Sequence, residues 1–138
     1  MPKVFISYRR DDSQHQADRI FGALTRVVPR KDIFIDIDGI PAGVDFVDHL
    51  NRQVEKCDTL LALIGPEWLT VRSANGQRRL DDPGDFVRIE IAAALKRGIT
   101  VAPVLLDGAT MPLERDLPAD LAQLARRNAI EIRRNSFE

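Results

Sequence analysis

The sequence has few of the residues that build disulfide frameworks or metal sites. Its 138 residues include a single cysteine, Cys57, so an internal disulfide is excluded. The two histidines, His15 and His49, have no spacing to each other or to Cys57 that suggests ligands, and we expect no metal.

An excess of charge of one sign and a long apolar run are missing as well. The 20 basic and 21 acidic residues leave a formal net charge of -1, which does not favour nucleic acid or a membrane surface as a partner. No apolar run approaches the roughly 20 residues needed to span a bilayer. Residues 1–3 lead into strand-like sequence without a signal peptide, so we expect a cytoplasmic location.

What the sequence does contain suits one globular domain. The chain is 44% hydrophobic, enough for a core, and 138 residues are too few for two ordinary domains. We therefore expect a single domain over residues 1–138. Residues 133–138 stand where a closing helix is expected, which suggests a fragment of a longer multidomain protein.

Strand-like and helical patterns alternate along the chain. The helical stretches are 13–28, 46–57, 86–97 and 117–127, and the strand-like ones are 4–8, 33–38, 59–64, 99–106 and 129–132. Two strands, 59–64 and 99–106, are apolar nearly throughout, which is typical of parallel strands buried on both faces, although Pro103 indicates an edge or a bulge. The pattern predicts a flavodoxin-like, three-layer α/β sandwich, with a five-stranded parallel sheet in the order 2-1-3-4-5 and helices on both faces.

One acid, Glu90, stands within the mostly hydrophobic surface of the helix that Asp85 caps. None of its neighbours on the helix is basic: they are Phe86, Val87, Ala93 and Ala94. Burying a carboxylate in such surroundings costs free energy, so it is expected to have a functional role, to be paired from elsewhere or to lie at the mouth of a cleft. Glu90 is therefore either a functional carboxylate or a surface or tertiary salt-bridge residue.

The predicted topology brings distant loops to one edge of the sheet. In a parallel sheet every loop that leaves the carboxyl end of a strand opens on the same side, where ligands bind. That edge collects residues 8–13, 36–43 and 66–69 and the first turns of the Glu90 helix. We expect the ligand site there.

Three stretches resemble the Toll/interleukin receptor (TIR) domain, and because they are spread from the first strand to the third helix, the resemblance extends over nearly the whole chain. They are VFISYRR at 4–10, FID with the following IPAG at 34–43, and FVRIEIAAAL at 86–95. The resemblance is greatest to bacterial TIR proteins and to TIR enzymes that cleave NAD. In those enzymes a glutamate of the third helix is catalytic, and Glu90 occupies that position. They commonly have a tryptophan four residues earlier, where this chain has Phe86, another ring able to stack on a base.

The resemblance implies an NAD+ glycohydrolase, which cleaves the nicotinamide–ribose bond to give nicotinamide and ADP-ribose or a cyclic ADP-ribose isomer. NAD+ is then the substrate, and no cofactor is expected. Activation by self-association with other TIR domains is implied too, in bacterial antiphage defence or virulence. The alternative is a non-catalytic adaptor that acts by homotypic TIR–TIR contacts, because adaptor TIR domains share the fold.

Several residues at the expected ligand edge are candidates for binding NAD+. Arg9 and Arg10 suit a pyrophosphate, since guanidinium groups pair with phosphate in a bidentate manner, or they are solvated loop charges. Tyr8 either contacts the ribose or base or is a core tyrosine with its hydroxyl at the rim. Asp36 and Asp38 suit a ribose hydroxyl or a water, or they satisfy loop amides.

Two further aromatic residues and one loop complete the set. Phe46 is expected in the core at a helix start, with ring contact to the substrate as the other interpretation. Trp68 either walls the cleft or covers the sheet edge. The loop of Gly39, Ile40, Pro41, Ala42 and Gly43 is expected to serve assembly, because the corresponding loop in TIR families docks on a neighbouring subunit.

The implied chemistry needs few groups. Cleavage passes through an oxocarbenium-like state and the nicotinamide departs neutral, so no general acid is required. One carboxylate can hold the ribose hydroxyls and stabilise the developing charge in a partly dry cleft. A third class of protein, a phosphoacceptor receiver suggested by Asp11 and Asp12, needs an aspartate ending the third strand and a lysine ending the fifth. Residues 63–65 and 130–132 supply neither.

Overall fold

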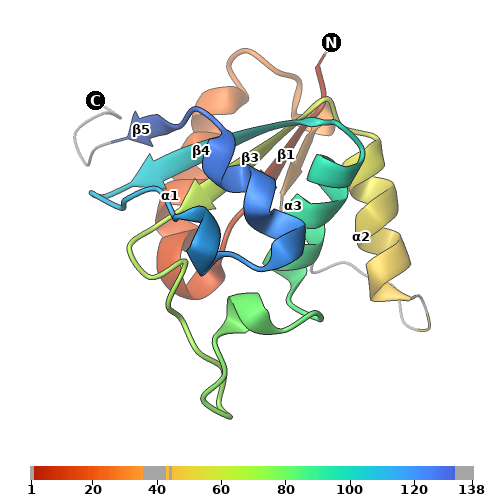
Figure 1. Ribbon diagram of the computed structural model, residues 1–138. Coiled ribbons are helices and arrows are strands. Elements are labelled where there is room, and N and C mark those ends of the chain that lie inside the picture. Colours follow the sequence, from red (N-terminus) through yellow and green to blue (C-terminus); the bar gives the residue numbers. More distant parts are fainter. Residues whose placement is uncertain (1, 36–42, 44, 133–138) are drawn as a thin grey trace.

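Five parallel strands form one sheet in the computed structural model, which describes residues 2–35, 43 and 45–132 (Figure 1). The strands are β1 (Val4–Ser7), β2 (Ile33–Ile35), β3 (Thr59–Ile64), β4 (Thr100–Leu106) and β5 (Ile130–Ile132). They lie in the order β2-β1-β3-β4-β5, and every neighbouring pair is parallel. The predicted fold class and strand order are confirmed.

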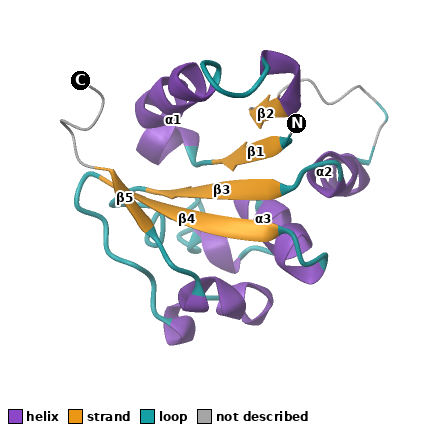
Figure 2. Ribbon diagram, turned by 90° about the horizontal axis from the view of Figure 1, so that it is seen from above, coloured by secondary structure: helices purple, strands orange, loops and turns teal. Residues whose placement is uncertain are grey.

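Helices cover both faces of this sheet (Figure 2). The helix α1 (Arg10–Leu24) packs on one face, while α2 (Phe46–Glu55), α3 (Phe86–Lys96) and the 3-10 helix η4 (Ala119–Arg126) pack on the other. Three short 3-10 turns lie in the connections: η1 (Arg30–Asp32), η2 (Arg79–Asp81) and η3 (Glu114–Asp116). No helix within the described ranges has the length and apolar character that crossing a membrane requires.

The strand β1, which lies between β2 and β3, places its side chains alternately on the two faces of the sheet. Successive side chains of a strand point to opposite sides, so Val4 and Ile6 join the hydrophobic cluster beneath α1, while Phe5 joins the cluster beneath α3. Ser7 shares the side of Phe5. All four residues are buried, because helices cover the sheet above and below.

The helices on the α3 face begin as the sequence predicts. Asp45 caps α2 by accepting hydrogen bonds from the amides of Val47 and Asp48. Asp85 caps α3 by accepting one from the amide of Arg88. Each aspartate satisfies amides that have no partner within the helix, which fixes where the helix starts.

The start of α1 corrects the sequence interpretation. Residues 9–13 were expected to form a loop, but the amides of Asp12 and Ser13 both bond to the carbonyl of Arg9, which closes a first helical turn. Ser13, the expected start, is instead a kink inside α1 with φ -146° and ψ 25°. The early turn brings Asp12 close to the end of β3, where the candidate site lies.

Local chemistry explains the form of η4 and the position of Pro103 in β4. The expected α-helix over 117–127 is the 3-10 helix η4, in which Leu121 and Leu124, three residues apart, both enter the core. Pro103 pairs with Ala62 of β3, and β5 pairs with β4 only from Val104 onward. Pro103 therefore lies where one side of β4 is an edge, so its missing amide hydrogen breaks no pairing with β5.

Candidate functional site

Glu90 lies on the inner side of α3, facing the end of β1. Its side chain is nearly sealed from solvent, with 5% of the residue exposed, and its Oε1 accepts a hydrogen bond of 2.8 Å from the Ser7 hydroxyl. Ser7 is the last residue of β1 and is only 1% exposed. The carboxylate therefore lies at the carboxyl end of the sheet, the edge where the sequence predicts the ligand site.

Burial raises the pKa of Glu90 to about 8, and the negative charge of Asp85 acts in the same direction. The hydrogen bond from Ser7 and the positive charge of Arg9 oppose this rise, because both favour the ionised form. The carboxyl group is mostly protonated at neutral pH and ionises in mildly alkaline solution. Perturbation of this kind is typical of functional carboxylates in clefts.

Arg9 links three elements around Glu90. Its Nη1 and Nη2 donate parallel hydrogen bonds of 2.9 and 2.8 Å to the two carboxylate oxygens of Asp85, and its Nε donates to the carbonyl of Trp68 at 3.1 Å. The guanidinium also lies 5.9 Å from the centroid of the Trp68 ring. Arg9 thus joins the end of β1 to the start of the Glu90 helix and to the loop after β3.

Asp12 holds the same loop from the side of α1. Its Oδ1 accepts a hydrogen bond of 3.0 Å from the amide of Glu67, and burial raises its pKa. A Cβ on Gly65 would lie 2.3 Å from Asp12 Oδ2, so the glycine is what allows the carboxylate to approach the loop. The turn from β3 to Trp68 is therefore shaped by side chains that follow β1.

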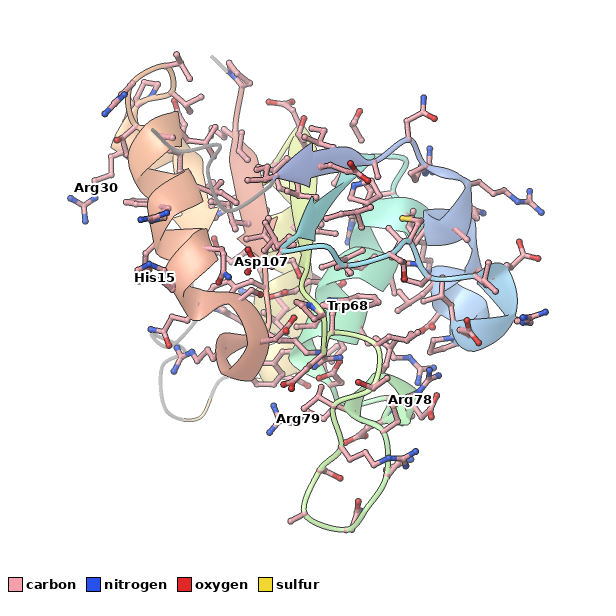
Figure 3. All side chains as sticks on the ribbon, turned by 90° about the vertical axis from the view of Figure 1, so that its left-hand side faces the viewer. His15, Arg30, Trp68, Arg78, Arg79 and Asp107 are labelled. Atoms are coloured by element: carbon pink, nitrogen blue, oxygen red, sulfur yellow. The ribbon has the colours of Figure 1, made fainter. Side chains whose placement is uncertain are left out.

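The predicted substrate-binding residues are brought together only in part. Arg9 and Trp68 lie close to Glu90's helix, and Trp68 is completely buried inside the molecule (Figure 3). Phe86 is 43% exposed one turn before Glu90. Tyr8 packs instead against the cluster beneath α1, on the other side of the sheet from Glu90, and Arg10 is exposed at the first position of α1.

Other predicted positions lie outside the described residues. They are Asp36, Asp38 and residues 39–42 of the expected assembly loop, together with the side chain of Phe46, whose backbone begins α2. Gly43, the last residue of that loop, has φ +82°, a conformation that favours glycine.

Sequence reasoning missed Ser7, and the signal for it was present. In VFISY the alternation that places Phe5 in the core places Ser7 on the same face, so a hydroxyl is directed at the helices that cover this face. The pairing of Asp85 with Arg9 and the contact of Asp12 with the loop after β3 were missed as well. Neither has a signal in local sequence, because both partners come from separate elements.

A cavity of about 470 Å³ opens between α2, α3 and η4, and Glu90 is not among the residues that line it. Its walls come from Asn51, Ile89, Ala92, Ala93, Leu95, Lys96, Ala119, Asp120 and Gln123. Within the part of the chain that the structure describes, no group of three or more His, Cys, Asp or Glu side chains could hold a metal ion. Around Glu90, the described residues supply a hydroxyl group from Ser7 and the positive charge of the Arg9 guanidinium.

Comparison with known proteins agrees with the fold. Residues 4–138 match the family described as the TIR domain. The fold is similar to that of the TIR domains in the activated Roq1 resistosome that directly recognises the pathogen effector XopQ. The TM-score is 0.64 at 11% sequence identity, over 99% of this chain and 90% of that one. No curated protein matches the chain.

Proposed function

The chain belongs to the TIR domain family, and we propose that it is an NAD+ glycohydrolase that uses Glu90 as its catalytic carboxylate. The observation that carries the proposal is the placement of Glu90: buried, bonded to Ser7 and located at the carboxyl edge of a parallel sheet. Taking an acid out of water without an ion-pair partner is expensive. A use for the carboxylate accounts for its retention.

The reaction requires few protein groups besides the Glu90 carboxylate. The bond between ribose C1′ and the nicotinamide nitrogen breaks, and its electron pair neutralises the pyridinium ring. Positive charge develops on the sugar, and ionised Glu90 stabilises it in surroundings where water does not screen the interaction. A water oxygen then bonds to C1′ and releases a proton, giving ADP-ribose. Attack by an atom of the ADP-ribose itself gives a cyclic isomer from the same cation.

The remaining residues receive roles that fit their placement. Phe86, exposed one turn before Glu90, suits stacking on a flat ring of the substrate. Arg9 already donates to Asp85 and Trp68, so we assign it the role of holding the Glu90 helix rather than the pyrophosphate. Arg10 keeps the proposed role at the pyrophosphate, and Tyr8, Asp36, Asp38 and Phe46 remain proposals for contact with the rest of NAD+.

We further propose that self-association activates the enzyme, as a device of bacterial antiphage defence or virulence. The similar structure is that of TIR domains in an activated resistosome, which is an assembly. Residues 39–43 are the proposed assembly loop. A TIR adaptor without chemistry would use the same contacts, so assembly alone does not distinguish the two functions.

The test is the release of nicotinamide from NAD+. The purified protein is incubated with NAD+ both in dilute solution and clustered on a multivalent scaffold, and nicotinamide and the ADP-ribose products are separated by chromatography. We expect turnover that increases on clustering. Absence of nicotinamide in both conditions would contradict the proposal and favour the adaptor.

A further inference from the structure

We propose that Ser7 is a positioning residue that holds the Glu90 carboxylate in the orientation required for catalysis. This inference rests on the proposed function, since it concerns the same site. Ser7 bonds to Glu90 across 83 positions of sequence and from a different layer of the fold. It has no place among the residues that the TIR resemblance implies.

The hydroxyl is carried by the last residue of an interior strand of the sheet. β1 pairs with β2 on one side and with β3 on the other, and Ser7 itself is in register with Ala62 of β3. A strand paired on both sides fixes the direction of its side chains better than a loop does. The position of Ser7 Oγ is thus set by the sheet, while Glu90 has a long side chain that could adopt several rotamers.

A serine also suits both protonation states of its partner. Its O–H donates to the ionised carboxylate, and its oxygen can accept from the protonated acid by rotation of the hydroxyl. The bond of 2.8 Å can therefore persist while Glu90 titrates. Because Ser7 engages Oε1, the other oxygen, Oε2, is the one expected to meet the ribose.

Among the described residues, the charges of two groups shift the pKa of Glu90. Neither group takes over the hydrogen bond that Ser7 makes to the carboxylate. Asp85, at the start of α3, disfavours the ionised form, and Arg9, which follows β1, favours it. These two charges are paired with each other by two hydrogen bonds and act on the pKa of Glu90 in opposite directions. The Ser7 hydroxyl is left as the direct donor that favours the carboxylate.

Replacement of Ser7 tests the inference, with Ser13 as a matched control. Both serines are 1% exposed, but the Ser13 hydroxyl donates to the backbone of Arg9 and not to Glu90. We expect Ser7→Ala to lower kcat roughly 10- to 100-fold with little change in KM, and to move the rising limb of the pH–rate profile to higher pH. Ser7→Thr, which keeps the hydroxyl, should recover much of the rate, and Ser13→Ala should change neither quantity. Wild-type kcat and an unmoved pH profile in Ser7→Ala would overturn the inference.

A measurement without turnover separates this inference from the proposed function. The side-chain carboxyl carbon of Glu90 is labelled and titrated by NMR in the wild type, in Ser7→Ala and, because sulfur fills the space but donates weakly, in Ser7→Cys. We expect the titration midpoint to rise in both variants. If NAD+ is not cleaved but the midpoint rises, the proposed function fails while Ser7 still controls Glu90. An unchanged midpoint contradicts that control, whether or not NAD+ is cleaved.

Discussion

Arg9 and Asp85 meet end to end, with the guanidinium donating two parallel hydrogen bonds of 2.9 and 2.8 Å to the carboxylate. The same carboxylate caps α3 through the amide of Arg88. The side chains are only 2% and 10% exposed, so solvent screens the pair little. One buried contact thus fixes the end of β1 and the start of the helix that carries Glu90.

The first prediction concerns the geometry of this pair. Arg9→Lys keeps the charge but loses the planar fork, so one of the two hydrogen bonds to Asp85 and the hydrogen bond to the carbonyl of Trp68 are lost. We expect the free energy of unfolding to fall by about 1–3 kcal/mol in urea titrations. Arg78→Lys is the matched control, since Arg78 forms the same two-bond geometry with Asp81, on the hairpin that projects from the body of the molecule (Figure 3). Because that pair is partly exposed, Arg78→Lys should lower the free energy of unfolding by less than about 1 kcal/mol. Equal losses in the two variants would remove the special role of Arg9.

The second prediction concerns the close approach at Gly65. Gly65→Ala places a Cβ against the Asp12 carboxylate and forces it away from the amide of Glu67. We expect a loss of about 1–2 kcal/mol, measured by urea unfolding. In an Asp12→Ala background the same change should cost close to nothing, which a double-mutant cycle detects. Gly22→Ala, in α1 with nothing within 4 Å of the added Cβ, should instead stabilise by about 0.5–1 kcal/mol. A full cost for Gly65→Ala in both backgrounds would show that Asp12 is not the cause.

The third prediction is a pH dependence of stability. The pKa of Glu90 rises from an ordinary 4.5 to about 8 in the folded protein. Between these values the folded state keeps a proton that the unfolded state has lost, so rising pH favours unfolding. The stability that Glu90 contributes is fully present below about pH 4.5 and is lost as pH rises through about 8. Glu90→Gln does not titrate, and its advantage over the wild type should grow across this window by an amount on the order of a few kcal/mol. A difference that is independent of pH would contradict the raised pKa.

The fourth prediction concerns the effect of Glu90 ionisation on the rate of NAD+ cleavage. If the ionised form of Glu90 stabilises the sugar cation, kcat/KM should rise with pH and level off above about pH 8. The nicotinamide leaving group requires no protonation, so no falling limb from a general acid is expected. Initial rates of nicotinamide release from pH 6 to 9 measure the profile. A rate that is flat or falls over this range would show that ionised Glu90 is not required.

The sequence predicts elements that depend on local pattern. Residues 59–64 match β3 at both ends, because an apolar run closed by Gly65-Pro66 leaves little choice of boundaries. Asp85 was identified as a cap because an N-cap bonds to an amide only two or three residues away, here that of Arg88. The parallel pairing of the strands followed from the alternation of strands and helices, and the flavodoxin-like order was confirmed.

Local sequence pattern did not predict which side chains of different layers contact each other. Which hydroxyl meets Glu90 depends on how α3 lies over β1, and Ser7 and Glu90 are 83 positions apart. Tyr8 was grouped with the site by its place in sequence, yet the alternation of β1 turns it toward α1. Arg9 was expected at a phosphate because its partner Asp85 comes from another element. The pairing of Arg9 with Asp85 depends on how the layers pack, which sequence pattern does not encode.

Whether Glu90 is the catalytic carboxylate is decided by comparing clustered wild-type protein with Glu90→Gln for release of nicotinamide from NAD+. The amide keeps the shape of the side chain and an oxygen that can accept from Ser7, so both proteins should fold, as circular dichroism and thermal melting will verify. The account predicts cleavage by the wild type and a loss of roughly 100-fold or more in kcat for Glu90→Gln. Cleavage by Glu90→Gln at the wild-type rate would contradict it.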